Sequence, residues 1–178
     1  GGIGLALEEP YFHITAEVAE KIEISASSSE SKFITRATKI VEKLKRLYEF
    51  PGVKLSFDKL IPFHTGLGSG TQLSLGITKA VCLLYGINLS TKDMALIAGR
   101  GGTSGIGVAA FEKGGFILDG VHRFPYPKSS FLPSSASHNV SPPPVLIRYD
   151  FPNWPILIVM PNCQHISGKK EVELFQSL

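Results

Sequence analysis

The sequence predicts an α+β domain, and three observations lead to that class. Apolar and polar residues alternate near the N-terminus and again just before a glycine-rich loop, as in half-buried strands. Two stretches repeat apolar residues every three or four positions, as helices do. The resulting order is strands, helix, strand, glycine loop, two helices and a strand. It lacks the steady strand–helix alternation of a doubly wound parallel sheet.

The N-terminal part is predicted to contain four strands and one amphipathic helix. In the strand around residue 13, His13 falls on the polar face, which favours a surface histidine over a catalytic one. The helix begins with Ser27 and Glu30 at capping-box spacing, carries an apolar stripe from Phe33 to Tyr48 (including Leu47), and ends at Phe50-Pro51-Gly52. The predicted strands are Gly2–Leu7, Tyr11–Val18 (Phe12, Ile14, Ala16 and Val18 inward), Lys21–Ser25 and Val53–Asp58.

The remainder is predicted to hold a buried helix, a short helix, further strands and a long connection. The helix after the glycine loop is apolar on nearly all faces, which predicts a central position, and it ends at Tyr85-Gly86. Ser90 is expected to cap the short helix. Val108–Phe111 is expected to be only a short apolar segment, and Val121–Pro144 a lid, a binding loop or a disordered connection. The last predicted elements are strands at Phe116–Asp119, Val145–Tyr149 and Ile156–Met160, and the start of a helix at Ser167–Leu178.

Length and composition indicate one globular domain, or one and a part. The 178 residues are 43% hydrophobic and 19% charged, and no apolar run is long enough to span a bilayer, so we expect a cytoplasmic protein. A net charge of +3 suits an anionic small molecule and is too weak to imply nucleic acid. Cys82 is expected to be a buried structural thiol. The first helix carries cations interpreted as a solvated face: Lys39, Lys43, Lys45 and Arg46.

The glycine-rich loop lies in the stretch from Ile61 to Tyr85, where Gly66, Gly68 and Gly70 occupy alternate positions. Glycine lets the chain turn sharply and bring its amides close to a ligand. A helix that begins there adds unpaired N–H groups and the positive end of its dipole. The stretch therefore predicts a site for phosphate or another anion, with a plain structural turn as the alternative. It lacks the lysine of a P-loop NTPase.

Two motifs resemble the GHMP superfamily, the group of galactokinase, homoserine kinase and mevalonate kinase. The run from Pro62 to Gly70 resembles its phosphate loop, with Gly70 and Thr71 where the kinases have Ser and Ala. Ser104-Gly105-Ile106 resembles the family's Ser-Gly-hydrophobe-Asp, but Gly107 replaces the Asp proposed as catalytic base, and a glycine accepts no proton. The resemblance implies a GHMP-type N-terminal domain over residues 1–150, with a mixed or antiparallel sheet and helices on one side. A second α+β domain would begin at residues 151–178.

A non-kinase branch, the β-ribofuranosylaminobenzene 5′-phosphate synthases, is similar over nearly the whole chain. The resemblance is strongest at Gly1–Leu7, His64–Leu73, Ser104–Glu112, Gly115–Gly120 and Arg148–Pro152. It implies condensation of phosphoribosyl diphosphate with 4-aminobenzoate, with release of CO2 and diphosphate, in methanopterin biosynthesis. It implies Mg²⁺ only through the diphosphate substrate, with no protein ligand identified, and it allows a homodimer. The family's first strand and most of its second domain are not in this sequence, so we expect a fragment.

The expected site residues follow from this resemblance. The amides of Gly66, Leu67, Gly68, Ser69, Gly70 and Thr71, with the hydroxyls of Ser69 and Thr71, would hold phosphate. Ser104 would add one hydrogen bond or cap its turn. Arg100 would neutralise the diphosphate, or would be a surface arginine. His64 would orient or protonate a substrate group, or would be structural.

Two other functions stay open at this point. One is an ATP-dependent GHMP small-molecule kinase that uses another acid than the one lost at Gly107. The other is a non-enzymatic RNA-binding module, because the half-fold expected here also occurs in a small-subunit ribosomal protein. Clustered cations with aromatic residues would favour the module, and the sequence offers few. The residues alone assign neither the aminobenzoate pocket nor the acid–base groups.

Overall fold

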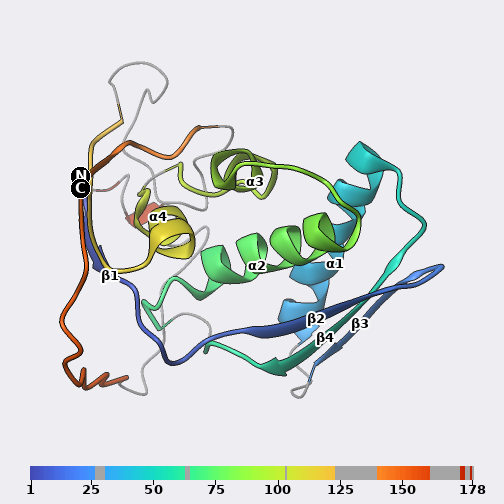
Figure 1. The fold of residues 1–178 in the computed structure, drawn as a ribbon, viewed down its shortest axis with the longest axis horizontal. Coiled ribbons are helices and arrows are strands. Elements are labelled where there is room, and N and C mark those ends of the chain that lie inside the picture. The colour runs from blue at the N-terminus through green and yellow to red at the C-terminus, as the bar shows by residue number, and fades with distance from the viewer. Residues whose placement is uncertain are drawn as a thin grey trace.

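The strands of the protein form two sheets, where the sequence analysis expected one (Figure 1). The computed structural model describes residues 1–26, 31–62, 65–102, 104–122, 140–160, 173–174 and 177. One sheet is antiparallel and has the order β1 (Ile3–Leu5), β5 (Phe116–Asp119), β6 (Val145–Tyr149). The other is mixed and has the order β2 (His13–Val18), β4 (Val53–Lys59), β3 (Ile22–Ala26). In it β2 is antiparallel and β3 is parallel to β4. The α+β class is confirmed.

Helix α2 (Ser69–Leu84) is the central element of the fold. It packs against α1 (Ser31–Tyr48), α3 (Thr91–Ile97), α4 (Ile106–Lys113) and strand β2. Its polar side chains are tolerated because they bond within the helix: the hydroxyl of Ser74 donates to the carbonyl of Gly70, and that of Thr78 to the carbonyl of Ser74. Burial on several faces confirms the central position predicted from the apolar pattern.

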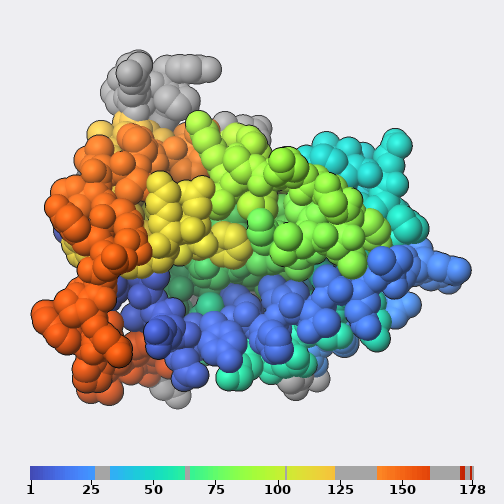
Figure 2. All heavy atoms as spheres, viewed as in Figure 1, coloured from blue at the N-terminus to red at the C-terminus, as the bar shows by residue number. Residues whose placement is uncertain are grey.

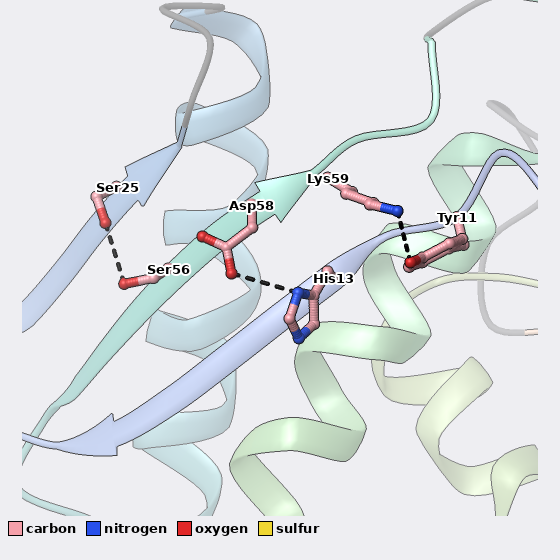
Figure 3. A network of polar contacts seen from close by, with 6 residues as sticks. All are labelled: Tyr11, His13, Ser25, Ser56, Asp58 and Lys59. Atoms are coloured by element: carbon pink, nitrogen blue, oxygen red, sulfur yellow. Dashed lines mark hydrogen bonds and ion pairs between the residues drawn. The ribbon is translucent and has the colours of Figure 1, made fainter.

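The main core lies between α1, α2 and the inner face of the mixed sheet. Phe33 of α1 packs edge-on against Phe57 of β4, with ring centroids 4.6 Å apart. The outer face of the sheet is polar (Figure 3): His13 pairs with Asp58 at 3.3 Å, and Lys59 donates to the hydroxyl of Tyr11 at 2.7 Å. His13 is therefore a surface histidine, as predicted. The fully buried residues of this core include Phe33, Ala37, Val41, Leu44, Val53, Leu55, Leu73, Ile77 and Val81.

Three predictions about local structure were wrong. Residues 106–113 form helix α4, where only a short apolar segment was expected. Residues 156–160 are not a strand: Leu157 is 88% exposed, and no partner strand is present among the described residues to take up its backbone hydrogen bonds. Val18 and Leu47, expected on apolar faces, are exposed at the ends of their elements.

Other elements agree with the sequence analysis or fall outside the described residues. Ser90 caps α3 by accepting from the amide of Asp93 at 3.1 Å, and Gly86 follows α2 with φ of 65°. The capping box at residues 27–30, most of the connection 121–144 and most of the helix predicted at 167–178 lie outside the described part. Within that part, no helix is both long and apolar enough to cross a bilayer.

Candidate functional site

The glycine loop enters α2 through two left-handed residues. Gly66 has φ of 79° and Gly68 has φ of 67°, values that L side chains rarely adopt. Helix α2 begins directly after Gly68 and has no side-chain cap. The amides of Thr71 and Gln72 bond to the carbonyl of Gly68 at 2.9 and 3.1 Å, which leaves the first amides of the helix for an external acceptor. This geometry is that of an anion cradle.

A cleft of about 590 Å³ adjoins the loop. Figure 2 shows the surface hollowed between the blue N-terminal segment and the yellow helix α4, with green atoms of α2 at its floor. Phe12, Ile61 and Phe111 contribute to its apolar wall, while Thr71 and Gln72 are among its polar groups. None of the described residues that line the cleft carries a charged side chain. The cleft therefore suits a flat, weakly polar group next to a bound anion.

Asp119, at the end of β5, joins three parts of the site. Its carboxylate accepts from the amide of Gly2, from the hydroxyl of Ser104 at 3.0 Å and from the amide of Gly105 at 2.6 Å. Asp119 is only 2% exposed, so these bonds replace its hydration. Ser104 also accepts from the amide of Ile106 at 3.2 Å and so caps the turn that leads into α4, one of the two roles predicted for it. The sequence analysis missed Asp119, although an acid that ends a short apolar strand is a usable signal.

Gly107 and Thr71 pack directly against each other. A β-carbon built on Gly107 would lie 3.1 Å from Cγ2 and 3.2 Å from Cβ of Thr71, tighter than ordinary contact. The amide side chain of Gln72 donates to the carbonyl of Gly107 at 2.7 Å. The start of α4 is thus fixed against the first turn of α2, and the room beside Gly107 is already filled.

Arg100 lies beside the first turn of α2 and does not line the cleft. Its Nε donates to the hydroxyl of Ser74 at 3.4 Å, and its guanidinium points toward Gly70. Arg36, from α1, reaches the same place and was not singled out by the sequence analysis. Burial, together with the charge of Arg36, lowers the pKa of Arg100 to about 10. Arg100 is half-buried and belongs to the surroundings of the loop, which argues against a plain surface arginine.

Comparison with known proteins identifies the domain. The family model described as the GHMP kinases N terminal domain matches residues 32–115, which contain the glycine loop, α2 and α4. Residues 32–115 therefore belong to a GHMP kinase N-terminal domain. Among solved structures, homoserine kinase from Cytophaga hutchinsonii is similar to 65% of this chain and 42% of its own, with 21% identity and a TM-score of 0.49.

Curated relatives are similar over the whole GHMP domain and beyond it. The β-ribofuranosylphenol 5′-phosphate synthase of Archaeoglobus fulgidus is 44% identical over 177 residues, covering 99% of this chain and 54% of its own length. The synthase of Methanocaldococcus jannaschii is 40% identical over 191 residues, covering 99% and 57%. The chain is a homologue of these synthases and spans about half of their length.

The remaining predicted groups of the GHMP domain are placed as follows. His64 lies outside the described residues, so its predicted role stays a prediction. Cys82 is buried, and burial raises the pKa of its thiol, in keeping with a structural role. Among the described residues, no three His, Cys, Asp or Glu side chains group in a way that would hold a metal ion.

Proposed function

We propose that the protein is a synthase that joins phosphoribosyl diphosphate to 4-aminobenzoate, with release of CO2 and diphosphate, in methanopterin biosynthesis. The homology to the archaeal synthases supports this activity. Their name specifies a ribofuranosylphenol product, which differs from the aminobenzene product only in the para substituent. We therefore take a para-amino or para-hydroxy benzoate as the acceptor class.

The contact between Thr71 and Gly107 is the observation that favours a synthase over a kinase. The GHMP kinase pattern has Ala and Asp at these two positions. Here the side chain of Thr71 fills the space in which a side chain on residue 107 would start. The two departures from the kinase pattern compensate each other sterically, and they leave no carboxylate at residue 107 to accept a proton from an alcohol substrate.

The glycine loop is the proposed holder of the phosphate-bearing substrate. The amides of Gly66–Gly70 would bind anionic oxygens, because Gly66 and Gly68 adopt left-handed angles and α2 starts without a side-chain cap. The amide of Thr71, also predicted to bind phosphate, is instead bonded to the carbonyl of Gly68. The hydroxyl of Thr71, which lines the cleft, would add one donor. The side chain of Ser69 is buried, so we assign its contribution to phosphate binding to its backbone amide rather than to its hydroxyl. Ser104 would act through the turn that it caps, and His64 remains a proposed substrate-orienting group.

The uncharged cleft suits the aromatic acceptor and its loss of CO2. In the proposed reaction the ring carbon that bears the carboxylate attacks C1 of the ribose, and the C1–O bond breaks with its electron pair leaving on diphosphate. The bond from the ring to the carboxylate then breaks, its electrons restore the aromatic ring, and CO2 departs. None of the described residues that line the cleft provides a charge partner for the carboxylate of the acceptor. The carboxylate is therefore less stable in the cleft than in bulk water, which favours loss of CO2.

Magnesium is implied by the diphosphate substrate alone. The described residues do not fit a protein-held Mg²⁺ site, since they provide no grouped acidic or histidine ligands and Asp119 is engaged by three donors. Mg²⁺ commonly binds through substrate phosphates with few protein ligands. We therefore derive no step of the mechanism from the metal.

The test is a radiochemical assay with the full-length protein. Phosphoribosyl diphosphate is incubated with carboxyl-labelled 4-aminobenzoate and, in parallel, with labelled 4-hydroxybenzoate. Release of labelled CO2 that depends on phosphoribosyl diphosphate supports the synthase, and the better acceptor identifies the para substituent. Formation of ADP from ATP with a small alcohol, without release of CO2 from either acceptor, would refute it in favour of a kinase.

A further inference from the structure

Two arginines from distant parts of the sequence meet beside the first turn of α2. Arg36 comes from the second turn of α1, and Arg100 follows α3 between Gly99 and Gly101, which have φ of 64° and 85°. A β-carbon built on Gly70 would lie 2.7 Å from Nη1 of Arg36 and 3.0 Å from Nη2 of Arg100. Both guanidinium groups therefore converge on one point of the helix surface.

Neither arginine forms an ion pair with any acidic side chain among the described residues. A hydrogen bond from Nε of Arg100 to the hydroxyl of Ser74 holds one edge of the Arg100 guanidinium. The terminal nitrogen Nη2 of the same group lies toward Gly70. Like charges held this close repel each other. Desolvation lowers the pKa of both groups, although Arg36 as a whole is exposed and Arg100 is half-buried.

Gly70 provides the space for this arrangement. The two guanidinium groups approach the helix in the space that a side chain on residue 70 would occupy. Glycine is a poor helix former, so its presence in the first turn calls for a local reason. Unlike Gly66 and Gly68, Gly70 has no positive φ, and the close approach of the arginines supplies that reason.

We propose that Arg36 and Arg100 form an anion subsite beside Gly70, and that the subsite binds a diphosphate group. Two planar guanidinium groups can donate hydrogen bonds to several oxygens at once. A diphosphate has enough oxygens to accept from both groups, whereas a single carboxylate has only two. The subsite lies beside the turn that carries the unpaired amides, so one diphosphate is placed to contact both. Its assignment to the diphosphate of phosphoribosyl diphosphate rests on the proposed function.

The test measures binding of inorganic diphosphate to the full-length protein by titration calorimetry at fixed ionic strength. We expect Arg36→Gln and Arg100→Gln each to weaken binding at least tenfold, and Arg36→Lys to restore only part of the loss because lysine has no fork. Arg46→Gln is the matched control: it removes the same charge from an exposed position of α1 and should change the affinity less than twofold. Equal affinities for Arg36→Gln and the control would overturn the proposal.

Gly70→Ala tests the same site without changing its charge. Alanine favours helix more than glycine does, so the fold is expected to be retained, while the added methyl displaces both guanidinium groups. We expect at least a fivefold loss of diphosphate affinity. Unchanged affinity in this variant, with wild-type thermal stability, would also overturn the proposal.

The outcome is separable from that of the proposed function, because diphosphate binding requires no acceptor and no turnover. Loss of binding in the arginine variants of a protein that releases no CO2 would support the subsite and refute the synthase. A working synthase in which Arg36→Gln binds diphosphate normally would refute the subsite alone.

Discussion

At the scale of single residues, the three loop glycines serve different purposes. Gly66 and Gly68 adopt left-handed backbone angles, whereas Gly70 has an ordinary helical place and provides room for Arg36 and Arg100. Their alternate spacing predicted an anion site, and the uncapped start of α2 agrees with it. The spacing alone does not show which glycine is needed for its positive φ and which for its small size. The need for a small residue at position 70 comes from side chains of α1 and of the turn after α3.

Gly68→Ala should reduce activity far more than it reduces stability. Gly86 is a matched control, because the two glycines have φ of 67° and 65° and neither has an atom within 4 Å of an added β-carbon. Alanine in the left-handed region costs about 1–2 kcal/mol at either site. We expect both variants to lose that much stability in urea unfolding, and only Gly68→Ala to lower kcat/KM, by at least tenfold. A similar loss of kcat/KM in Gly86→Ala would contradict a specific role for Gly68.

Asp119→Asn should destabilise the protein by about 1–3 kcal/mol, because the amide cannot accept from all three donors and leaves a buried N–H unpaired. Asp150→Asn is the control, since Asp150 is exposed and pairs only with Arg148, so its change should stay within about 0.5 kcal/mol. Urea unfolding monitored by circular dichroism measures both. Equal stabilities of the two variants would show that Asp119 does not hold the site together.

At the scale of secondary-structure elements, the helices whose apolar pattern is long were predicted and the short one was missed. Helix α1 and helix α2 have several turns of periodic apolar residues. Helix α4 has only eight residues and includes Gly107 near its start, so local propensity argues against it. Its start is stabilised by the turn that Ser104 caps and by the contact with Thr71, and the second of these is a tertiary contact that a single sequence does not reveal.

The contact between α2 and α4 predicts energetic coupling of Thr71 and Gly107. Replacing glycine by alanine in a helix usually stabilises a protein by about 1 kcal/mol. In the wild-type background Gly107→Ala should raise the free energy of unfolding by less than this, because its methyl group crowds Thr71. Thr71→Ala removes the crowding by Cγ2 but keeps Cβ, so the crowding is partly relieved and the coupling in a double-mutant cycle should reach about 0.5 kcal/mol. Thr15→Ala, on the exposed face of β2, is the control and should be additive with Gly107→Ala. Additivity of Thr71→Ala would contradict the contact.

At the scale of the whole molecule, the sequence predicted the α+β class and most elements, but not how distant segments join. The pairing of β1 with β5 and the meeting of Arg36 with Arg100 link residues far apart in the chain, and neither follows from local periodicity. The strand predicted at Ile156–Met160 failed for a related reason. Its β-branched and apolar residues favour an extended chain, but a strand also requires a partner for its backbone groups.

Exposed apolar side chains gather on β6 and the segment that follows it. They include Leu146, Tyr149, Trp154, Leu157 and Val159. A surface of this kind usually contacts other polypeptide. Because the chain spans about half the length of its curated relatives, we propose that residues 151–178 begin a second domain that covers this surface, while residues 1–150 form the GHMP-type domain.

Trp154 reports on this second domain directly, because it is the single tryptophan of the 178 residues and is 66% exposed. In the full-length protein we expect its fluorescence to shift to shorter wavelength and to resist quenching by acrylamide, relative to the 178-residue chain, because apolar contacts would exclude water and quencher from the indole. Subtracting the signal of Trp154→Phe in the full-length protein removes any other tryptophan. Tyr11→Phe, just before β2 and bonded to Lys59, serves as the control for general changes of emission. If Trp154 is quenched equally in both chains, the additional polypeptide does not cover this surface, and the proposal is refuted.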